Sequence, residues 1–260
     1  MAMAAGHTVF GLRRSDAALP DGVERIQADL SDPGSIPALP AVDAVLMAVG
    51  ADGRSESEYR SAYVDGPGNL AAALGGVRRE VVLSSTGVFG ADDGRDVGVE
   101  AAPEPTTVTG RVLLEAEEAA FERGATVLRL AGIYGPGRVR LLRTIRDGTA
   151  WQRGNLDAWS NLIHRDDAAG LSLRLLELDA PPKVVHGVDD TPTVRRELLA
   201  GLAELMGVEA PGGGEAEATR GKRVLNGGLG RLGYALKHGS WKSGYAELVP
   251  TSTRAYARNS

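Results

Sequence analysis

The stretch REVVLSST (79–86), continued by GVFG (87–90), is an apolar run that ends in hydroxyl side chains and glycine. Short runs rich in Val and Leu that end in turn-forming residues are typical of strands. Five other segments share this pattern and are expected to be strands: 7–12, 23–29, 43–50, 125–132 and 182–189. The stretch 79–86 is therefore one of six expected strands.

Helical patterns separate these runs. Residues 56–74 and 106–123 carry apolar side chains at helical spacing, and three further helices are expected within 137–148, 164–179 and 193–207. Alternating strands and helices predict a parallel sheet covered on both faces. We expect an α/β protein with a Rossmann-like, doubly wound sheet over 1–135 and a smaller C-terminal lobe over 136–260, from which 182–189 returns to the sheet. The Gly-rich polar stretch 209–221 is expected to be a mobile loop.

The composition argues against several classes of function. The chain has 260 residues and a net charge of −5, from 29 basic and 34 acidic residues, whereas a nucleic-acid binder would show a basic face. With no cysteine and four scattered histidines, a metal site is not expected. No apolar run approaches the roughly 18 residues of a membrane span, and the start lacks the features of a signal peptide. We expect a cytoplasmic protein that binds a small molecule and neither nucleic acid nor membrane.

Several segments, taken in order, resemble one enzyme superfamily. They are GHTVFGLRRS (6–15), ADLSDP (28–33), YVDGPGNL (63–70), VVLSSTGVFG (81–90), RLAGIYGPGR (129–138) and NLIHRDDAA (161–169). Together they resemble the short-chain dehydrogenase/reductase superfamily, in its extended and atypical branch of NAD-dependent epimerase/dehydratase-like proteins. The resemblance runs from about Gly6 to Val249. It is more specific for the fold than for the reaction, because one fold supports many reactions.

The resemblance implies a nicotinamide cofactor, NADP or NAD, and suggests which residues would hold it. Arg13 and Arg14, at the end of the first expected strand, would meet the adenosine ribose, and an arginine there can pair with a 2′-phosphate. Asp29 would hydrogen-bond the adenine amino group, assisted by the backbone of Leu30. Small side chains would let the dinucleotide approach the backbone at Ala48, Val49 and Gly50. Each position also has an alternative interpretation. Arg13 and Arg14 could be solvated surface charges, and Asp29 could simply form a turn. The small residues at 48–50 could allow tight packing against the following helix.

The resemblance also places catalytic residues. Ser85 falls where the superfamily has a Ser or Thr that hydrogen-bonds the substrate, although a strand-end hydroxyl can also be satisfied by backbone. The usual Tyr and Lys positions hold Thr107 and Arg111, and neither replaces a phenol as a proton donor. Tyr134 or Tyr63 could substitute, with packing as the alternative for each. A general-base role for His164 is the weaker alternative to a structural role at a helix start.

Two glycine features complete the sequence predictions. GLGRLG (228–233) fits the dinucleotide fingerprint literally, but no strand–helix context surrounds it, so we expect a loop and helix of the C-terminal lobe. MAMAAGH (1–7) resembles the last turn of a helix ending at Gly6. The first strand, glycine loop and first helix of the superfamily would precede it. Three arrangements are then open: the next strand closes directly onto the sheet, another segment or subunit fills the gap, or residues precede Met1.

Two functions follow from these residues. One is an NAD(P)-dependent oxidoreductase or epimerase acting on a small hydroxyl or carbonyl substrate. The other is a redox-inactive protein of the same fold, such as a ligand-binding or regulatory module or a cofactor-independent isomerase or cyclase. The helices within 56–74 and 106–123 are the faces through which similar proteins often dimerise, so a homodimer is also expected.

Overall fold

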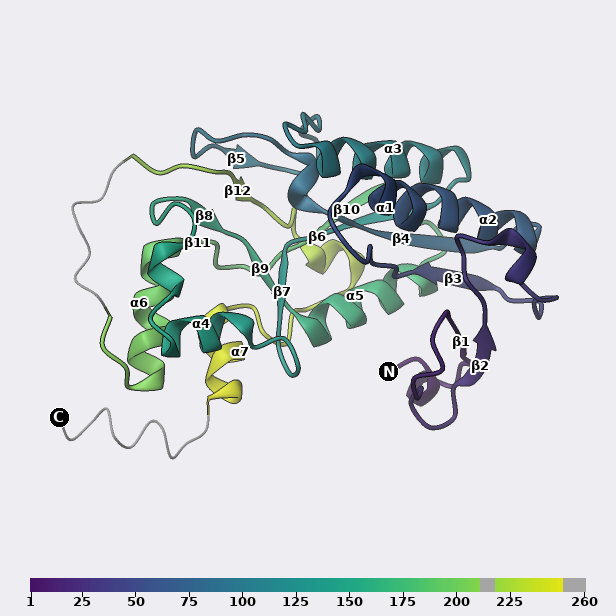
Figure 1. Ribbon diagram of the computed structural model, residues 1–260, viewed down its shortest axis with the longest axis horizontal. Helices are drawn as coiled ribbons and strands as arrows, with labels where there is room; N and C mark the ends of the chain where they lie inside the picture. Colours follow the sequence, from purple (N-terminus) through teal and green to yellow (C-terminus); the bar gives the residue numbers. More distant parts are fainter. Residues whose placement is uncertain (211–217, 250–260) are drawn as a thin grey trace. The chain divides into compact units, whose positions relative to one another are not determined.

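The computed structural model describes residues 1–210 and 218–249 (Figure 1). The chain divides into two compact units and crosses between them several times. Unit 1 contains residues 1–88, 105–129 and 169–185, and unit 2 contains 89–104, 130–168 and the described residues from 186 onward. Of the lobe expected over 136–260, residues 169–185 thus belong to unit 1.

A four-stranded sheet forms the centre of unit 1, with strand order β10-β6-β4-β3. The strands are β3 (Ala44–Met47), β4 (Arg79–Ser85), β6 (Thr126–Leu130) and β10 (Val184–Gly187), and the last two residues of β10 are assigned to unit 2. β3 and β4 are parallel, with Ala44 opposite Arg79. The expected α/β fold is confirmed, and the segment expected to return to the sheet provides its edge strand β10.

Helices cover the sheet as the periodicity predicts. The segment 56–74 forms α1 (Glu56–Arg60), a π-helical turn (Ser61–Asp65) and α2 (Gly66–Leu74) without interruption. The helix expected within 106–123 is α3 (Val108–Glu122). Figure 1 draws α1, α2 and α3 on one side of β4 and α5 (Arg165–Glu177) on the other. The alternating apolar residues pack between these layers, in a core that includes Met47, Leu70, Val82, Ala120 and Val127.

The two strands at the start of the chain form a sheet of their own. β1 (Phe10–Arg13) and β2 (Glu24–Gln27) are parallel, with Phe10 opposite Glu24. Leu12 packs against the unit 1 core. Direct closure of β1 onto the main sheet, one of the three open arrangements, is not adopted. Among the described residues no strand pairs with the outer edge of β3, where Leu46 is exposed.

Unit 2 combines short strand pairs with three helices. The pairs are β7 (Gly132–Tyr134) with β9 (Leu162–His164), β8 (Trp159–Ser160) with β11 (Thr193–Val194), and β5 (Asp96–Val97) with β12 (Arg223–Val224). The helices are α4 (Arg140–Arg146), α6 (Arg195–Met206) and α7 (Trp241–Leu248). Their apolar faces bury a core that includes Tyr134, Ile145, Leu199, Leu202 and Tyr245.

Two smaller predictions have clear outcomes in the described residues. GLGRLG contains a 3₁₀ turn (Leu229–Leu232) and not a strand–loop–helix unit, as expected. Gly6 ends a single 3₁₀ turn (Met3–Ala5) in the left-handed conformation. Most of the expected mobile loop, residues 211–217, lies outside the described residues. In the described part of the chain, no helix combines the length and apolar character that crossing a membrane requires.

Candidate functional site

The hydroxyl predicted to face a substrate lies at the end of β4. Ser85 is the last residue of that strand, and its Oγ accepts the backbone N–H of Gly87 at 3.1 Å. The side chain is partly exposed. A hydroxyl that accepts from this amide still has its own proton to donate to a ligand. The placement is compatible with the predicted role and also with the local backbone bond given as its alternative.

Thr107 and Arg111 begin the helix beside that turn. Thr107 is the N-cap of α3, and its Oγ1 accepts the backbone N–H of Gly110 at 3.0 Å. A Cβ on Gly110 would lie 2.8 Å from the carbonyl oxygen of Gly87, so the turn after Ser85 and the start of α3 are in close contact. Arg111 is exposed on the first turn of α3. The structure thus brings Ser85, Thr107 and the start of α3 together.

The residues predicted to hold the adenosine end of a cofactor also share one edge of unit 1. Arg14, after β1, forms an ion pair with Asp52 at 3.0 Å, just beyond the segment Ala48–Gly50 that follows β3. Both side chains are more than half exposed. Arg13 donates instead to the carbonyl oxygens of Ala17 and Ala18 at 3.4 and 3.3 Å. Of the two arginines, Arg14 is the one that faces the end of β3.

Asp29 and Leu30 are engaged in local hydrogen bonds. The Asp29 carboxylate accepts the N–H and hydroxyl of Ser31 at 2.9 and 2.7 Å, and these bonds hold its pKa below the usual value. The carbonyl of Leu30 accepts the Asn69 amide at 2.8 Å. Gly50 would have nothing within 4 Å of an added Cβ. The backbone at Gly50, after β3, therefore has free space beside it.

The two tyrosines considered as proton donors differ in environment. Tyr134 is 2% exposed, stacks on Tyr245 with ring centroids 4.3 Å apart, and donates its hydroxyl to the carbonyl of Ser240 at 3.5 Å. Burial raises its pKa well above the usual value. Tyr63 lies in the π-helical turn of unit 1 and is only partly buried, and burial raises its pKa as well. The contacts of Tyr134 are those expected of a packing residue.

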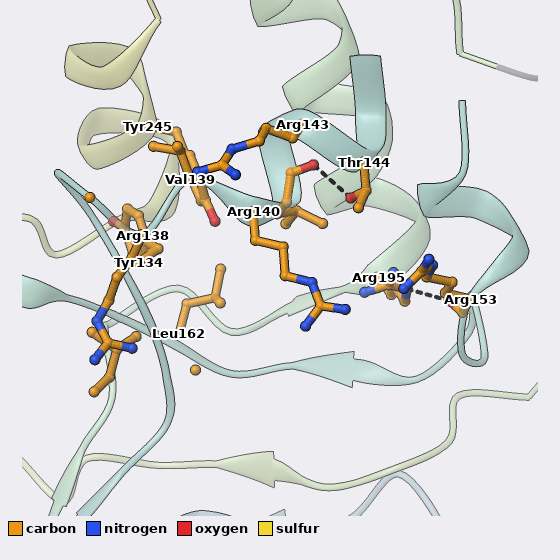
Figure 2. Close-up of a pocket in the computed structure, with 14 residues that line it drawn as sticks. Tyr134, Arg138, Val139, Arg140, Arg143, Thr144, Arg153, Leu162, Arg195 and Tyr245 are labelled. Atoms are coloured by element: carbon orange, nitrogen blue, oxygen red, sulfur yellow. Dashed lines mark hydrogen bonds between the residues drawn. The ribbon is translucent and has the colours of Figure 1, made fainter. Parts of the chain in front are cut away.

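A pocket of about 550 Å³ in unit 2 was not predicted (Figure 2). It lies between the end of β7, α4, the start of α6 and Tyr245 of α7. Five arginines line it, together with Thr144 and apolar residues: Arg138, Arg140, Arg143, Arg153 and Arg195. In Figure 2 the guanidinium groups of Arg140, Arg153 and Arg195 reach into the same region. We call this site the arginine pocket.

The arginine pocket contains no acidic residue. Arg195 donates to the backbone carbonyls of Arg153 and Ala150 at 3.0 and 3.1 Å, and burial lowers its pKa. In the described part of the chain, no carboxylate forms an ion pair with any of the five, whereas Arg196, next to Arg195, pairs with Asp157 at 3.0 Å. With no carboxylate partner among the described residues, the guanidinium groups of Arg140, Arg153 and Arg195 can donate directed hydrogen bonds to an anion.

A sequence pattern could have drawn attention to this pocket. The segment 138–146 contains four arginines and no acidic residue. The other contributors, Arg153 and Arg195, come from distant segments, so only the fold shows that they converge.

His164 lies in a buried cluster of unit 2 with Asp167 and His238, whose ligand atoms come within 4.8 Å of one another. Such a cluster could hold a metal ion, which the scattered histidines of the sequence did not suggest. Hydrogen bonds within the cluster nevertheless occupy both carboxylate oxygens of Asp167, through the N–H of Lys237 at 2.7 Å and that of His238 at 2.9 Å.

Comparisons with known proteins agree with the geometry. The family model described as NAD dependent epimerase/dehydratase family matches residues 1–186. A structure described as an NAD-dependent epimerase/dehydratase from Methylobacillus flagellatus is 31% identical, covers 95% of this chain and 90% of its own, and has a TM-score of 0.80. A comparison with curated protein sequences gives no significant match.

More distant structures share the fold. MoeE5, solved with UDP-glucuronic acid and NAD, has a TM-score of 0.77 at 22% identity over 94% of this chain and 90% of its own. WbmG of Bordetella bronchiseptica, solved with NAD and UDP, has a TM-score of 0.74 at 15% identity over 95% of this chain and 86% of its own.

Proposed function

Because the chain belongs to the NAD-dependent epimerase/dehydratase family, we propose that it is an NAD(P)-dependent epimerase or oxidoreductase whose small hydroxyl or carbonyl substrate carries an anionic group. The single observation that carries the anionic group is the arginine pocket, with five guanidinium groups and no carboxylate. The similar structures solved with UDP or UDP-sugars make a nucleoside diphosphate sugar the first substrate class to test.

The chain's own residues have distinct parts in this proposal. The arginine pocket would bind an anionic group. The Ser85 hydroxyl would donate a hydrogen bond to the reacting oxygen. The edge formed by Arg14, Asp29 and Ala48–Gly50 would hold the adenosine end of the cofactor. When bound, the nicotinamide supplies a reversible acceptor for hydride.

The preference between the two nicotinamide cofactors depends on Arg14. Its partner Asp52 is exposed, so the pair is weak and can be exchanged for a 2′-phosphate at little cost. We therefore propose NADP as the preferred cofactor. Replacing Arg14 by Ala should weaken NADPH binding, followed by fluorescence, several-fold more than NADH binding, and Arg25→Ala on β2 is the control. Equal losses for both cofactors would exclude this role.

The anion site is tested with UDP and UDP-glucose in a calorimetric titration. Arg140→Ala and Arg143→Ala should each weaken binding about tenfold, because a charge-assisted hydrogen bond contributes about 1.5 kcal/mol or more. Arg146→Ala is the matched control, since Arg146 is exposed on the same helix and does not line the pocket. If Arg146→Ala weakens UDP binding as much as the pocket variants do, only the overall charge of α4 affects binding. The arginine pocket would then not be the anion site.

One observation favours the redox-inactive alternative. Thr107 stands where the superfamily has its tyrosine, and its hydroxyl caps α3. If neither NADH nor NADPH binds at millimolar concentration while UDP-glucose does, the protein is a ligand-binding member of the fold. Turnover of NADPH with a carbonyl substrate, lost in Ser85→Ala, would exclude that alternative.

A further inference from the structure

Among the described residues, three side chains with hydroxyl groups line the arginine pocket: Tyr134, Thr144 and Tyr245. Thr144 belongs to α4, Tyr134 ends β7, and Tyr245 lies in α7. The two tyrosines are each 2% exposed, and their rings stack with centroids 4.3 Å apart and planes 13° apart. They form one aromatic wall of the pocket, so their hydroxyl groups can be compared directly.

Two of these hydroxyl groups are hydrogen-bonded within the protein. Thr144 donates to the backbone carbonyl of Leu141 at 2.8 Å, and Tyr134 donates to that of Ser240 at 3.5 Å. Within residues 1–210 and 218–249, the hydroxyl of Tyr245 forms no hydrogen bond. Most buried hydroxyl groups do have a partner, because a buried polar group without one is costly. The Tyr245 hydroxyl is therefore available to a ligand in the pocket.

This hydroxyl is a neutral donor. Burial raises the pKa of Tyr245 well above its usual value, so the phenol keeps its proton throughout the neutral range. A phenol offers one O–H donor and carries no charge, whereas each guanidinium group offers several N–H donors and a positive charge. Tyr245 can thus donate to an oxygen of a bound anion without adding charge to the pocket.

The position of the tyrosines in the pocket limits the ligand that can use this donor. Figure 2 draws the two tyrosines on one side of the pocket and Arg153 and Arg195 on the other. The carbonyls of Arg153 and Ala150 hold the Arg195 guanidinium in place. A ligand that meets both sides needs acceptor oxygens at two ends. A diphosphate has them, because its oxygens are spread over two phosphoryl groups and accept from both O–H and N–H donors.

We propose that Tyr245 is a binding residue of the arginine pocket, whose hydroxyl donates a hydrogen bond to a phosphate oxygen of a diphosphate ligand while guanidinium groups bind its other oxygens. The inference deepens the proposed function and rests on its anion site. It gives Tyr245 a role that Tyr134 lacks, although the two rings are equally buried, because the hydroxyl of Tyr134 already has a partner.

Binding is tested by calorimetric titration of the full chain with inorganic pyrophosphate and with UDP. Tyr245→Phe removes the hydroxyl and keeps the stacked ring. It should weaken the binding of both ligands about tenfold, because a hydrogen bond to a charged acceptor is lost. Tyr134→Phe is the matched control: it removes the hydroxyl of the neighbouring ring and should leave both affinities unchanged. Wild-type affinity in Tyr245→Phe, or an equal loss in both variants, would overturn the proposal.

Near-ultraviolet difference spectra test the contact itself. Pyrophosphate does not absorb where tyrosine does, so a spectral change on its addition comes from the protein. A phenol absorbs at longer wavelength when its hydroxyl donates a stronger hydrogen bond. The wild type and Tyr134→Phe should show this shift and Tyr245→Phe should not, which assigns the signal among the six tyrosines of the chain. The same shift in Tyr245→Phe would exclude the contact.

Urea denaturation separates a role in binding from a role in folding. Because the Tyr245 hydroxyl has no partner in the part of the chain that the structure describes, its removal breaks no hydrogen bond there. The free energy of unfolding of Tyr245→Phe should therefore not fall. A clear fall would show that the hydroxyl is bonded within the protein, and would overturn its assignment to a ligand.

This proposal and the proposed function fail in different ways. If neither pyrophosphate nor UDP binds the wild type, the anion site is wrong, and the role of Tyr245 falls with it. If both bind and Arg140→Ala weakens them while Tyr245→Phe does not, the anion site stands and the role of Tyr245 alone is wrong.

Discussion

Arginine has opposite surroundings in the core of unit 1 and in the arginine pocket of unit 2. In unit 1, Arg129 is buried and forms three hydrogen bonds of 2.7 to 3.1 Å with Glu117, and Arg123 pairs with Glu80 at 2.6 Å. The five arginines of the pocket have no such partner among the described residues. A guanidinium that is paired with a carboxylate stabilises the fold, whereas one without a carboxylate partner can still bind a ligand.

The largest expected effect comes from breaking the buried pair. Glu117→Ala removes the carboxylate that pairs with the buried Arg129 and also removes the acceptor of the Ser84 hydroxyl, at 2.6 Å. The free energy of unfolding should fall by about 3–5 kcal/mol, measured by urea denaturation. Glu115→Ala, which breaks the half-exposed pair with Arg60, should cost less than about 1 kcal/mol. Equal losses would mean that burial does not distinguish the two pairs.

Unit 2 should instead be sensitive to pH through Asp189. Burial raises the pKa of this carboxyl to about 7. Since the unfolded chain releases that proton near pH 4, the folded state holds the extra proton between the two values, and stability should fall as the pH rises from about 4 to about 7. The loss is roughly 2–4 kcal/mol. Unfolding midpoints at several pH values check this, and Asp189→Asn should flatten the curve. A variant with the wild-type slope would contradict the assignment.

The packing of α7 gives the next effect. Gly244→Ala places a methyl group against the Tyr134 ring, where no space exists, and should lower the free energy of unfolding by about 1–3 kcal/mol. It should also weaken UDP binding, because Tyr245 moves with α7. Gly230→Ala is the control, since a Cβ there meets nothing within 4 Å. If both substitutions are equally mild, α7 is not held as closely as described.

The smallest effect concerns the stability of the arginine pocket itself. Like charges that converge without partners repel, so Arg140→Gln should raise the free energy of unfolding by up to about 0.5 kcal/mol. Added salt should stabilise the wild type more than this variant, because it screens the repulsion. A clear loss of stability would show that Arg140 has a partner and belongs with the paired arginines of unit 1.

Much of the fold could be predicted from the sequence because its elements are local patterns. The strand at 79–85 follows from a run of apolar residues, and the helix at 108–122 follows from apolar residues at helical spacing. The arginine pocket could not, because Arg140, Arg153 and Arg195 are adjacent only after α4 and α6 have packed. The same holds for His238, whose partners lie 71 residues before it and 9 after it.

For the individual site residues, the sequence predicts the position in the fold but not the role toward a ligand. The sequence places Ser85 at a strand end and Arg14 at another, and the structure confirms those local positions. Their roles toward a ligand remain predictions, because a role depends on what the side chain faces. Asp29 illustrates this: its carboxylate bonds to Ser31, two residues away, an interaction that the resemblance to a cofactor-binding family did not suggest.

The free edge of β3 has a consequence for motion within unit 1. In a strand paired on one side only, alternate backbone N–H groups point to the neighbouring strand and the others point away from it. Within the described ranges, half of the β3 amides therefore lack a strand partner, although β4, next to it, is paired on both sides. Local opening should cost least at this edge, which also carries the residues proposed to meet the nucleoside end of the cofactor. Ligand binding there should slow the hydrogen exchange of those outward-facing amides.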